Sequence, residues 1–222
     1  MRHTIREYAA MDVPPATLAS LLSHVRLAPS SGNMAAWHVV IVRAQETKDA
    51  LAAAAWGQTF LTQAPVLLVW FANETHSASK YAERGAFYAL QDATIAGSYF
   101  QLLATSAGLA SGWAGAFREE DVAAAVGAGA GLRPIALMSV GFAAQSRERR
   151  HRRPLRALAS ELGPGGAWQP LEGHDGADCD TGEAYCEHPL SAALRQRRAA
   201  EVQEATLGAA GGVSEVGQQG GI

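Results

Sequence analysis

The stretch Leu27–Val42, LAPSSGNMAAWHVVIV, decides the fold because it marks the point where a buried strand begins. Its second half, WHVVIV, is apolar and rich in β-branched residues, which is typical of a strand. The segment before it is polar, PSSGN at residues 29–33, and these residue types most often form turns. Two interpretations are open: a turn that leads into the strand, or a rim of hydrogen-bonding groups that binds a ligand.

Outward from this stretch, the spacing of apolar residues predicts the neighbouring elements. It predicts a helix over residues 14–26, a strand over residues 37–43 and an alanine-rich helix that ends at Ala55. The segment VLLVWFA, residues 66–72, predicts a second strand. Its unbroken apolar run suits a sheet that is buried on both faces.

The longest helical pattern runs from Tyr81 to Gly108, where glycine suits the end of a helix. Apolar residues cover much of its circumference, which indicates a central helix, packed in part against a partner subunit. After it we expect a glycine-rich loop over residues 108–117, a short helix with an acidic first turn from residue 118, and a third strand over residues 133–143. This order predicts an α+β protein with a sheet flanked by helices, not a repeating βαβ fold.

The composition changes after Ser160, so we expect a domain over residues 1–160 and a C-terminal extension over residues 161–222. Glycine, acidic residues and proline dominate the extension. A short helix is predicted over residues 190–205, followed by a disordered end.

Bulk properties limit the class of protein. A hydrophobic content of 48% over 222 residues suits one globular core, and the net charge of −3 argues against nucleic acid as a partner. No apolar run reaches the length of about 18 residues that a membrane span needs, and no signal-peptide pattern follows Met1. Because the chain has only two cysteines, Cys179 and Cys186, we expect a cytoplasmic protein without disulfides.

Two arginine-rich segments are candidates for binding an anion. In MRHTIREY, Arg2, Thr4 and Arg6 alternate, and guanidinium and hydroxyl groups donate well to phosphate oxygens. The alternative for this segment is a solvated terminus. The second segment, SRERRHRRPLR, holds six arginines between residues 147 and 156. It can form an anion pocket together with Arg2, a nucleic-acid patch or a solvated basic face.

Other chemistry has weaker support. The extension carries His174, Cys179, Cys186 and His188, whose types suit zinc, but no C-x2-C pair is present and we favour free thiols. A hydrolytic triad of Ser30, His38 and Asp92 is not supported, because Ser30 lacks the setting of a nucleophile elbow. His38 lies within an apolar strand, which favours a core or interface position. Anion-binding groups without an acid–base pair indicate that a cofactor carries the chemistry.

Four motifs, in this order, resemble those of the FMN-dependent nitroreductase family over residues 2–156. They are RHTIREY (2–8), APSSGNMAAW (28–37), QDATIAGSYFQLLATSAGLASGWAGAF (91–117) and RRPLRAL (152–158). Two adjacent positions depart from the family pattern A-P-S-x-x-N-x-Q-P-W: Ala35-Ala36 replaces Gln-Pro. This removes a rigid turn and a polar side chain, so we expect an unusual substrate preference.

The resemblance implies a nitroreductase-like mixed β-sheet flanked by helices, in an intertwined homodimer with a long central interface helix and FMN at the interface. Arg2, Thr4, Arg150 and Arg152 would then bind the phosphate, and His3 would also belong to the cofactor site. Arg6 would stabilise negative charge on the reduced ring. Gln58 and the backbone of Ala114 and Gly115 would face the ring edge. Pro29, Ser30, Ser31 and Asn33 would come from the other subunit. Tyr81, Arg84 and Phe87 are substrate candidates, and no metal is expected.

The function that this resemblance implies is ping-pong hydride transfer from NAD(P)H, through FMN, to an electron-poor small molecule. Nitroaromatics, quinones and enone-like compounds are the expected acceptors. Two alternatives are a flavin-dependent dehydrogenase or oxidase of the same fold, and a non-catalytic module that binds an anion or a metal. The sequence does not distinguish NADH from NADPH.

Overall fold

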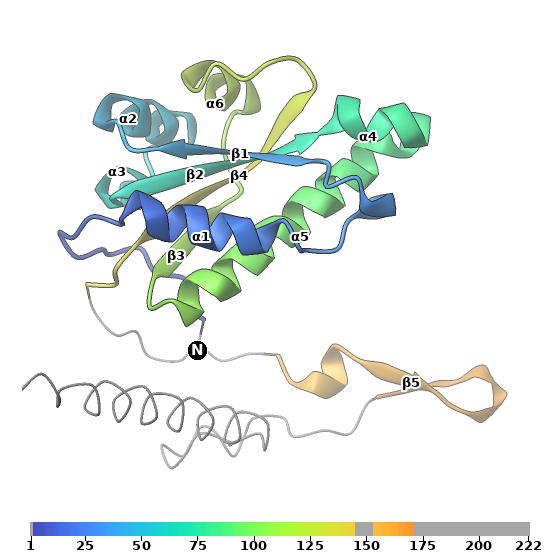
Figure 1. The fold of residues 1–222 in the computed structure, drawn as a ribbon. Coiled ribbons are helices and arrows are strands. Elements are labelled where there is room, and N and C mark those ends of the chain that lie inside the picture. Colours follow the sequence, from blue (N-terminus) through green and yellow to red (C-terminus); the bar gives the residue numbers. More distant parts are fainter. Residues whose placement is uncertain (1, 145–152, 171–222) are drawn as a thin grey trace, which may run out of the picture. The chain divides into compact units, whose positions relative to one another are not determined.

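A four-stranded sheet forms the centre of the computed structural model, which describes residues 2–144 and 153–170 (Figure 1). The strands are β1 (Trp37–Val42), β2 (Val66–Asn73), β3 (Ala110–Ala114) and β4 (Leu132–Gly141), in the order β1-β2-β4-β3. Neighbouring strands are all antiparallel. Within the described residues, parallel pairing occurs at an isolated bridge between Thr4 and Ser111, so the N-terminal segment is what makes the sheet mixed.

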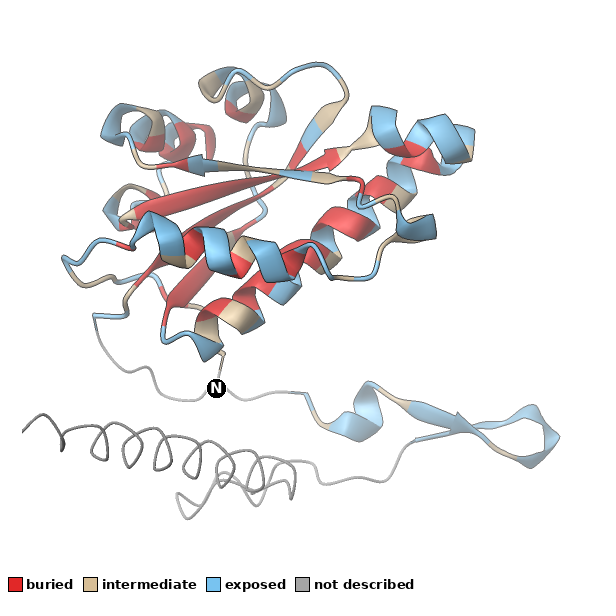
Figure 2. Cartoon of the chain, in the orientation of Figure 1, coloured by how far each residue is buried: buried red, intermediate tan, exposed pale blue. Residues whose placement is uncertain are grey.

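Helices cover both faces of this sheet, and its strands are buried between them (Figure 2). One face packs against α1 (Pro15–Val25) and α5 (Gly85–Ser106). The other packs against α2 (Gln45–Ala54), α3 (Phe60–Gln63) and α6 (Glu119–Ala125). Successive side chains of β2 point to opposite faces, so Leu68 and Trp70 join the first layer and Leu67 and Val69 the second. The prediction of an α+β sheet protein with a doubly buried strand is confirmed.

The long helix α5 begins at Gly85, four residues later than the predicted start. A separate helix, α4 (Glu74–Tyr81), and a 3-10 turn (Ala82–Arg84) precede it. Ala82 breaks the pattern because its backbone has φ 47° and ψ −124°, a region that residues with side chains rarely adopt. At the other end α5 stops at Ser106, and Gly108 has φ 79°, as expected for a glycine after a helix.

The prediction of a loop throughout residues 108–117 is wrong, because residues 110–114 form strand β3. Its glycine, Gly112, lies where the N-terminal segment packs against the strand, and a Cβ there would come within 2.5 Å of the carbonyl oxygen of Ile5. The backbone N–H of Ile5 donates to the carbonyl of Ser111 at 3.0 Å. Glycine therefore permits close pairing of two segments here, whereas composition alone indicated a loop.

His38 lies on β1, an edge strand of the sheet, and is exposed. The core position that its apolar neighbours favoured is therefore wrong. An interface position for His38 stays a prediction. Among the described residues, no helix has the length and apolar character needed to cross a bilayer.

Contacts divide the chain into two compact units, residues 1–149 and residues 150–222. In the described part of the second unit, β5 (Ser160–Leu162) pairs antiparallel with β6 (Trp168–Pro170). A 3-10 turn, Leu155–Ala157, precedes this hairpin, and another, Pro164–Gly166, lies between its strands. The helix predicted over residues 190–205 and the predicted disordered end lie outside the described residues.

Candidate functional site

The N-terminal segment lies along β3 and presents several of the predicted cofactor-binding residues. Thr4 forms the parallel bridge to Ser111, and Ile5 is buried beside it. Since side chains alternate along an extended segment, Arg6 points away from the core together with Thr4. The Arg6 guanidinium lies over the Phe60 ring, 5.3 Å from its centroid, in cation–π geometry. Arg2 and His3 precede them in the same segment and are half-buried.

The end of β3 leads from buried Ala114 to exposed Gly115. The side-chain amide of Gln58 donates to the carbonyl of Ala55 at 3.1 Å and to that of Ala116 at 3.4 Å. Gln58 therefore holds the loop that follows Gly115. The sequence predicted that Gln58 touches a ligand. The structure shows that it also has a structural role, which the sequence did not reveal.

The polar segment at residues 29–33 is a turn, as one of the two interpretations predicted. Residues Ser31–Asn33 form a 3-10 turn in which Gly32 and Asn33 have φ 55° and 60°. Ala35 also has a left-handed backbone, with φ 46°. The Ser30 hydroxyl accepts a hydrogen bond from the Ala35 N–H at 2.9 Å and closes the turn. We call residues 30–36 the polar loop.

A buried carboxylate fixes the polar loop to α5. Asp92 is only 1% exposed. Its Oδ1 accepts from the N–H of Ser31 at 2.8 Å and its Oδ2 from the N–H of Ala36 at 3.1 Å. Hydrogen bonds to a charged acceptor are stronger than neutral ones, so this contact orders the loop.

Helix α4 holds the carbonyl groups of the same loop. Lys80 Nζ donates to the carbonyl of Gly32 at 3.1 Å. The His76 ring Nε2 lies 3.1 Å from the carbonyl of Met34, to which it donates in its Nε2–H form. Thus the loop is attached to two helices through both its donors and its acceptors.

The three predicted substrate residues lie together beside the polar loop. A Cβ on Gly32 would overlap the Tyr81 hydroxyl, so glycine allows that close approach. Tyr81 packs against Tyr88 with 4.8 Å between ring centroids. Arg84 lies 5.3 Å from the Phe87 ring centroid and 5.1 Å from that of Tyr88, and donates to the Tyr88 hydroxyl at 3.1 Å. This arrangement is an aromatic cluster with one cation inside it.

The predicted residues thus form two groups on different elements of the chain. The first, at the N-terminal segment and the end of β3, is supported by β3 and Phe60. The second, the polar loop with the aromatic cluster, is supported by α4 and α5. Arg150, Arg152, His174, Cys179, Cys186 and His188 lie outside the described residues, and within those that are described no cluster of His, Cys, Asp or Glu could hold a metal ion.

Sequence reasoning missed four residues that build the second group: His76, Lys80, Tyr88 and Asp92. A signal was present for two of them. Tyr88 and Asp92 follow Arg84 at intervals of four residues, which places all three on one side of a helix. A single carboxylate in an apolar helix also indicates a buried partner, because a charge is rarely buried without one.

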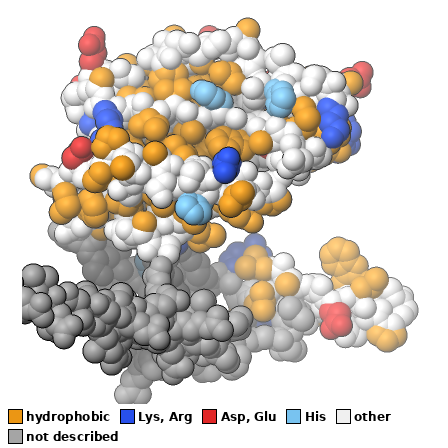
Figure 3. All heavy atoms as spheres, viewed as in Figure 1, with side chains coloured by type: hydrophobic (Ala, Val, Ile, Leu, Met, Phe, Trp, Pro, Cys, Tyr) orange, Lys and Arg blue, Asp and Glu red, His pale blue; other side chains and the backbone are white. Residues whose placement is uncertain are grey.

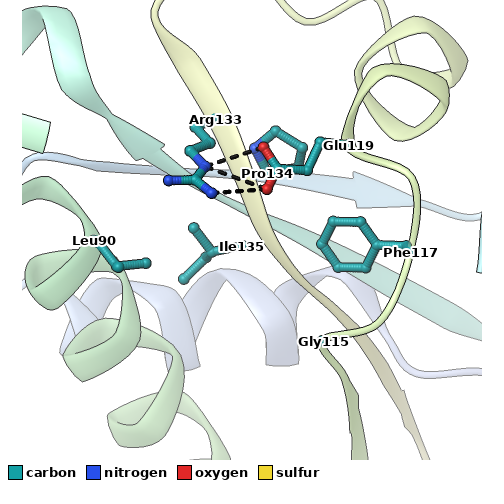
Figure 4. A pocket seen from close by; sticks show the side chains of 7 residues that line it. All are labelled: Leu90, Gly115, Phe117, Glu119, Arg133, Pro134 and Ile135. Carbon is teal, nitrogen blue, oxygen red and sulfur yellow. Dashed lines mark hydrogen bonds and ion pairs between the residues drawn. The ribbon is translucent and has the colours of Figure 1, made fainter. Parts of the chain in front are cut away.

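A pocket of about 220 Å³ lies next to Gly115 (Figure 4). Its lining comes from α5, the loop after β3, the start of α6 and β4: Leu90, Gly115, Phe117, Glu119, Arg133, Pro134 and Ile135. Most of these residues are apolar, and the two charged ones form an ion pair. Sequence analysis did not identify Glu119, Arg133 or this pocket.

The two-sided sheet with a long helix across one face is the α+β fold of solved nitroreductases. The structure superposes on that of a nitroreductase family protein from Streptococcus pneumoniae with a TM-score of 0.66, at 21% identity over 72% of this chain and 96% of that one. It superposes on an FMN-dependent nitroreductase from Clostridium difficile with a TM-score of 0.59, at 24% identity over 67% of this chain and 87% of that one.

The sequence gives the same answer. The nitroreductase family model matches residues 1–60 and 53–142. An NADH dehydrogenase from Thermus thermophilus is 32% identical over 182 residues, which span 69% of this chain and 89% of the relative. The chain belongs to the nitroreductase family, and the resemblance inferred from the four motifs is confirmed.

Proposed function

We propose that the protein is an FMN-dependent oxidoreductase that uses NAD(P)H to reduce an electron-poor small molecule, such as a nitroaromatic, a quinone or an enone-like compound. The observation that carries this proposal is the pairing of the N-terminal segment with β3, which places Thr4 and Arg6 along the strand that ends at Ala114, just before Gly115. The names of the relatives support it: one is an NADH dehydrogenase and another an FMN-dependent nitroreductase.

The described residues fit the chemistry of FMN, which has an anionic phosphate and a flat ring with hydrogen-bonding edges. Arg2 and Thr4 offer donors for a phosphate, while exposed Gly115 offers backbone at which a ring edge can approach closely. When bound, FMN supplies the transfer of two electrons between the substrates. The chain supplies the binding, the orientation and the charge.

Arg6 is the residue proposed to act on the electronics of the ring. Arg6 is exposed, its guanidinium lies over the Phe60 ring, and among the described residues it forms no ion pair with a carboxylate. A fixed cation next to the ring stabilises negative charge that develops on reduction. Arg6→Gln should lower the reduction potential of bound FMN, and Arg6→Lys should restore part of it.

A homodimer is the proposed assembly. Four large hydrophobic side chains of α5 are exposed: Phe87 by 50%, Leu90 by 39%, Tyr99 by 42% and Leu102 by 60%. At 3.6 residues per turn they lie on the side opposite the buried alanines that face the sheet. Figure 3 shows hydrophobic side chains exposed on the surface of this unit, with charged side chains mostly toward the edges. Large apolar side chains that are exposed together on one side of a helix mark an interaction site. A second copy of the chain bound there would bring the polar loop of one subunit to the N-terminal segment of the other.

The test is an absorbance spectrum of the purified protein followed by anaerobic titration with NADH and, separately, NADPH. We expect a yellow protein, as isolated or after FMN is added, that is bleached by one or both nicotinamides and regains its colour when a nitroaromatic or a quinone is added. A protein that stays colourless with FMN would contradict the proposal. Bound FMN that neither nicotinamide bleaches would favour the alternative, a flavin-dependent dehydrogenase or oxidase.

A further inference from the structure

The pocket beside Gly115 combines three large apolar side chains with one ion pair, and polar atoms form most of its accessible lining. Leu90, Phe117 and Ile135 supply the walls, and the volume of about 220 Å³ suits a single substituted aromatic ring. The pocket is next to the backbone that the proposed function places at the ring edge of FMN. It is therefore in position to hold a molecule that exchanges electrons with that ring.

The ion pair is bidentate. Arg133 Nε lies 3.0 Å from Glu119 Oε2 and Arg133 Nη2 lies 2.9 Å from Glu119 Oε1. The hydrogen bond to Arg133 lowers the pKa of Glu119, and Glu119 raises the pKa of Arg133 in return. Both groups are therefore charged at neutral pH, and the carboxylate neutralises the guanidinium.

Glu119 contacts two of the three nitrogens of the guanidinium. Figure 4 shows that the third nitrogen of Arg133 points away from Glu119. It can donate to the oxygen of a nitro, amide or carbonyl group. The carboxylate of Glu74 also lies near enough to favour the charged form of Arg133. Two carboxylates, those of Glu119 and Glu74, act on the single positive charge of Arg133. The net charge of these three groups is negative, so it does not attract an anion.

We propose that this pocket binds an uncharged aromatic molecule through a hydrogen bond from Arg133, and that Glu119 makes it discriminate against aromatic anions. The proposal rests on the proposed function and adds to it a charge preference for the acceptor. Glu119 acts here through Arg133, so it determines specificity without taking part in electron transfer.

The test uses benzamide and benzoate, which have the same shape and differ in charge, titrated into the FMN-loaded protein by calorimetry. The wild type should bind benzamide more tightly than benzoate. Glu119→Gln should improve benzoate binding by about fivefold, the effect of one ion pair at a half-exposed site, with little change for benzamide. Arg133→Gln should weaken both ligands and leave benzoate the poorer one.

The matched control is Glu120→Gln, which removes the same charge from the neighbouring exposed residue of α6, outside the pocket lining. It should leave both affinities as in the wild type. The proposal would be overturned if Glu119→Gln left the ratio of benzamide affinity to benzoate affinity unchanged, or if Glu120→Gln changed that ratio equally. If the protein binds no FMN, the proposed function fails, while titration of the same two ligands into the protein without FMN still tests the pocket. If nicotinamide bleaches the flavin but the ratio does not respond to Glu119, this inference alone fails.

Discussion

The carboxylate of Asp92 accepts a hydrogen bond from the backbone N–H of Ala36 at 3.1 Å, and this contact explains a departure from the family pattern. The pattern has proline at this position, and proline has no N–H to donate. Ala36 therefore adds a donor that the pattern lacks, in addition to removing a rigid ring. In this chain the shape of the polar loop depends on a buried carboxylate in α5.

Replacing Asp92 by asparagine should destabilise the protein. Asparagine keeps the shape but has one acceptor oxygen, so either Ser31 or Ala36 would face an N–H₂ group. A buried donor left without an acceptor should lower the free energy of unfolding by about 2 kcal/mol. Urea unfolding measures this, with the exposed Glu120→Gln as control. FMN affinity should fall as well if the polar loop contacts the cofactor. Equal stability of Asp92→Asn and the wild type would contradict the assigned role.

Replacing Ala36 by proline tests the same contact from the other side. The variant should lose about 1 kcal/mol, less than Asp92→Asn, because the bond from Ser31 to Asp92 remains. In an Asp92→Ala background the same proline should have little effect, since the acceptor has already gone. A double-mutant cycle measures this coupling. Additive effects would show that the two residues act independently.

The sequence predicted those parts of the fold that depend on apolar spacing. The strand at Val66 and the helix ending before Gly108 follow from burial, which periodicity reports directly. β3 was missed because Gly112 is required by close packing against Ile5, and composition cannot separate that need from a flexible loop. The break at Ala82 was missed because alanine favours helices, whereas its backbone here lies outside the helical region.

For the site, motif order identified the segments but not the contacts that fix them. Arg6 and Gly115 were named from the family pattern, whereas their support by Phe60 and β3 depends on pairing between distant segments. The Glu119–Arg133 pair joins residues that are 14 positions apart on different elements. From the sequence alone, each of the two charges is expected to lie on a solvated surface, and only the fold brings them together in one pocket. Such long-range pairs leave no local signal.

Ala82→Gly should stabilise the protein. Its φ of 47° and ψ of −124° cost little for glycine but about 1 kcal/mol or more for alanine. The same substitution at Ala50, exposed within α2, should instead destabilise the protein by about 0.5–1 kcal/mol. Thermal unfolding of both variants provides the comparison. A loss of stability in both would show that the backbone at Ala82 is not strained.

Tyr8 should make stability depend on pH in the alkaline range. Burial raises the pKa of Tyr8 from 10.0 to about 12, although hydrogen bonding to Ser139 and the charge of Arg6 lower it. The folded protein therefore retains this proton when the unfolded chain has lost it. The contribution is complete below pH 10 and is lost as pH rises through about 12, amounting to about 2–3 kcal/mol.

Tyr8→Phe should remove that dependence. At pH 8 the variant should be less stable than the wild type, because it lacks the hydrogen bonds of the hydroxyl to Ile5 and Ser139. Between pH 10 and 12 the difference should shrink, as measured by urea unfolding at each pH. Glu120→Gln, at an exposed position of α6, is the control. A difference that does not vary with pH would contradict the prediction.

The proposed homodimer predicts the effect of a charge on the exposed side of α5. Leu102 is 60% exposed, so Leu102→Glu should not disturb the core of one chain. Buried against a partner, however, an unpaired carboxylate is strongly unfavourable, and the variant should be largely monomeric. Met11→Glu places the same charge at another exposed apolar position, 54% exposed and outside α5, and should not change the assembly. Sedimentation and light scattering report the mass of each variant.

A monomeric variant should also lose FMN affinity, because each site would lack the polar loop of the partner. A dimeric Leu102→Glu that retains FMN would exclude this side of α5 as the interface.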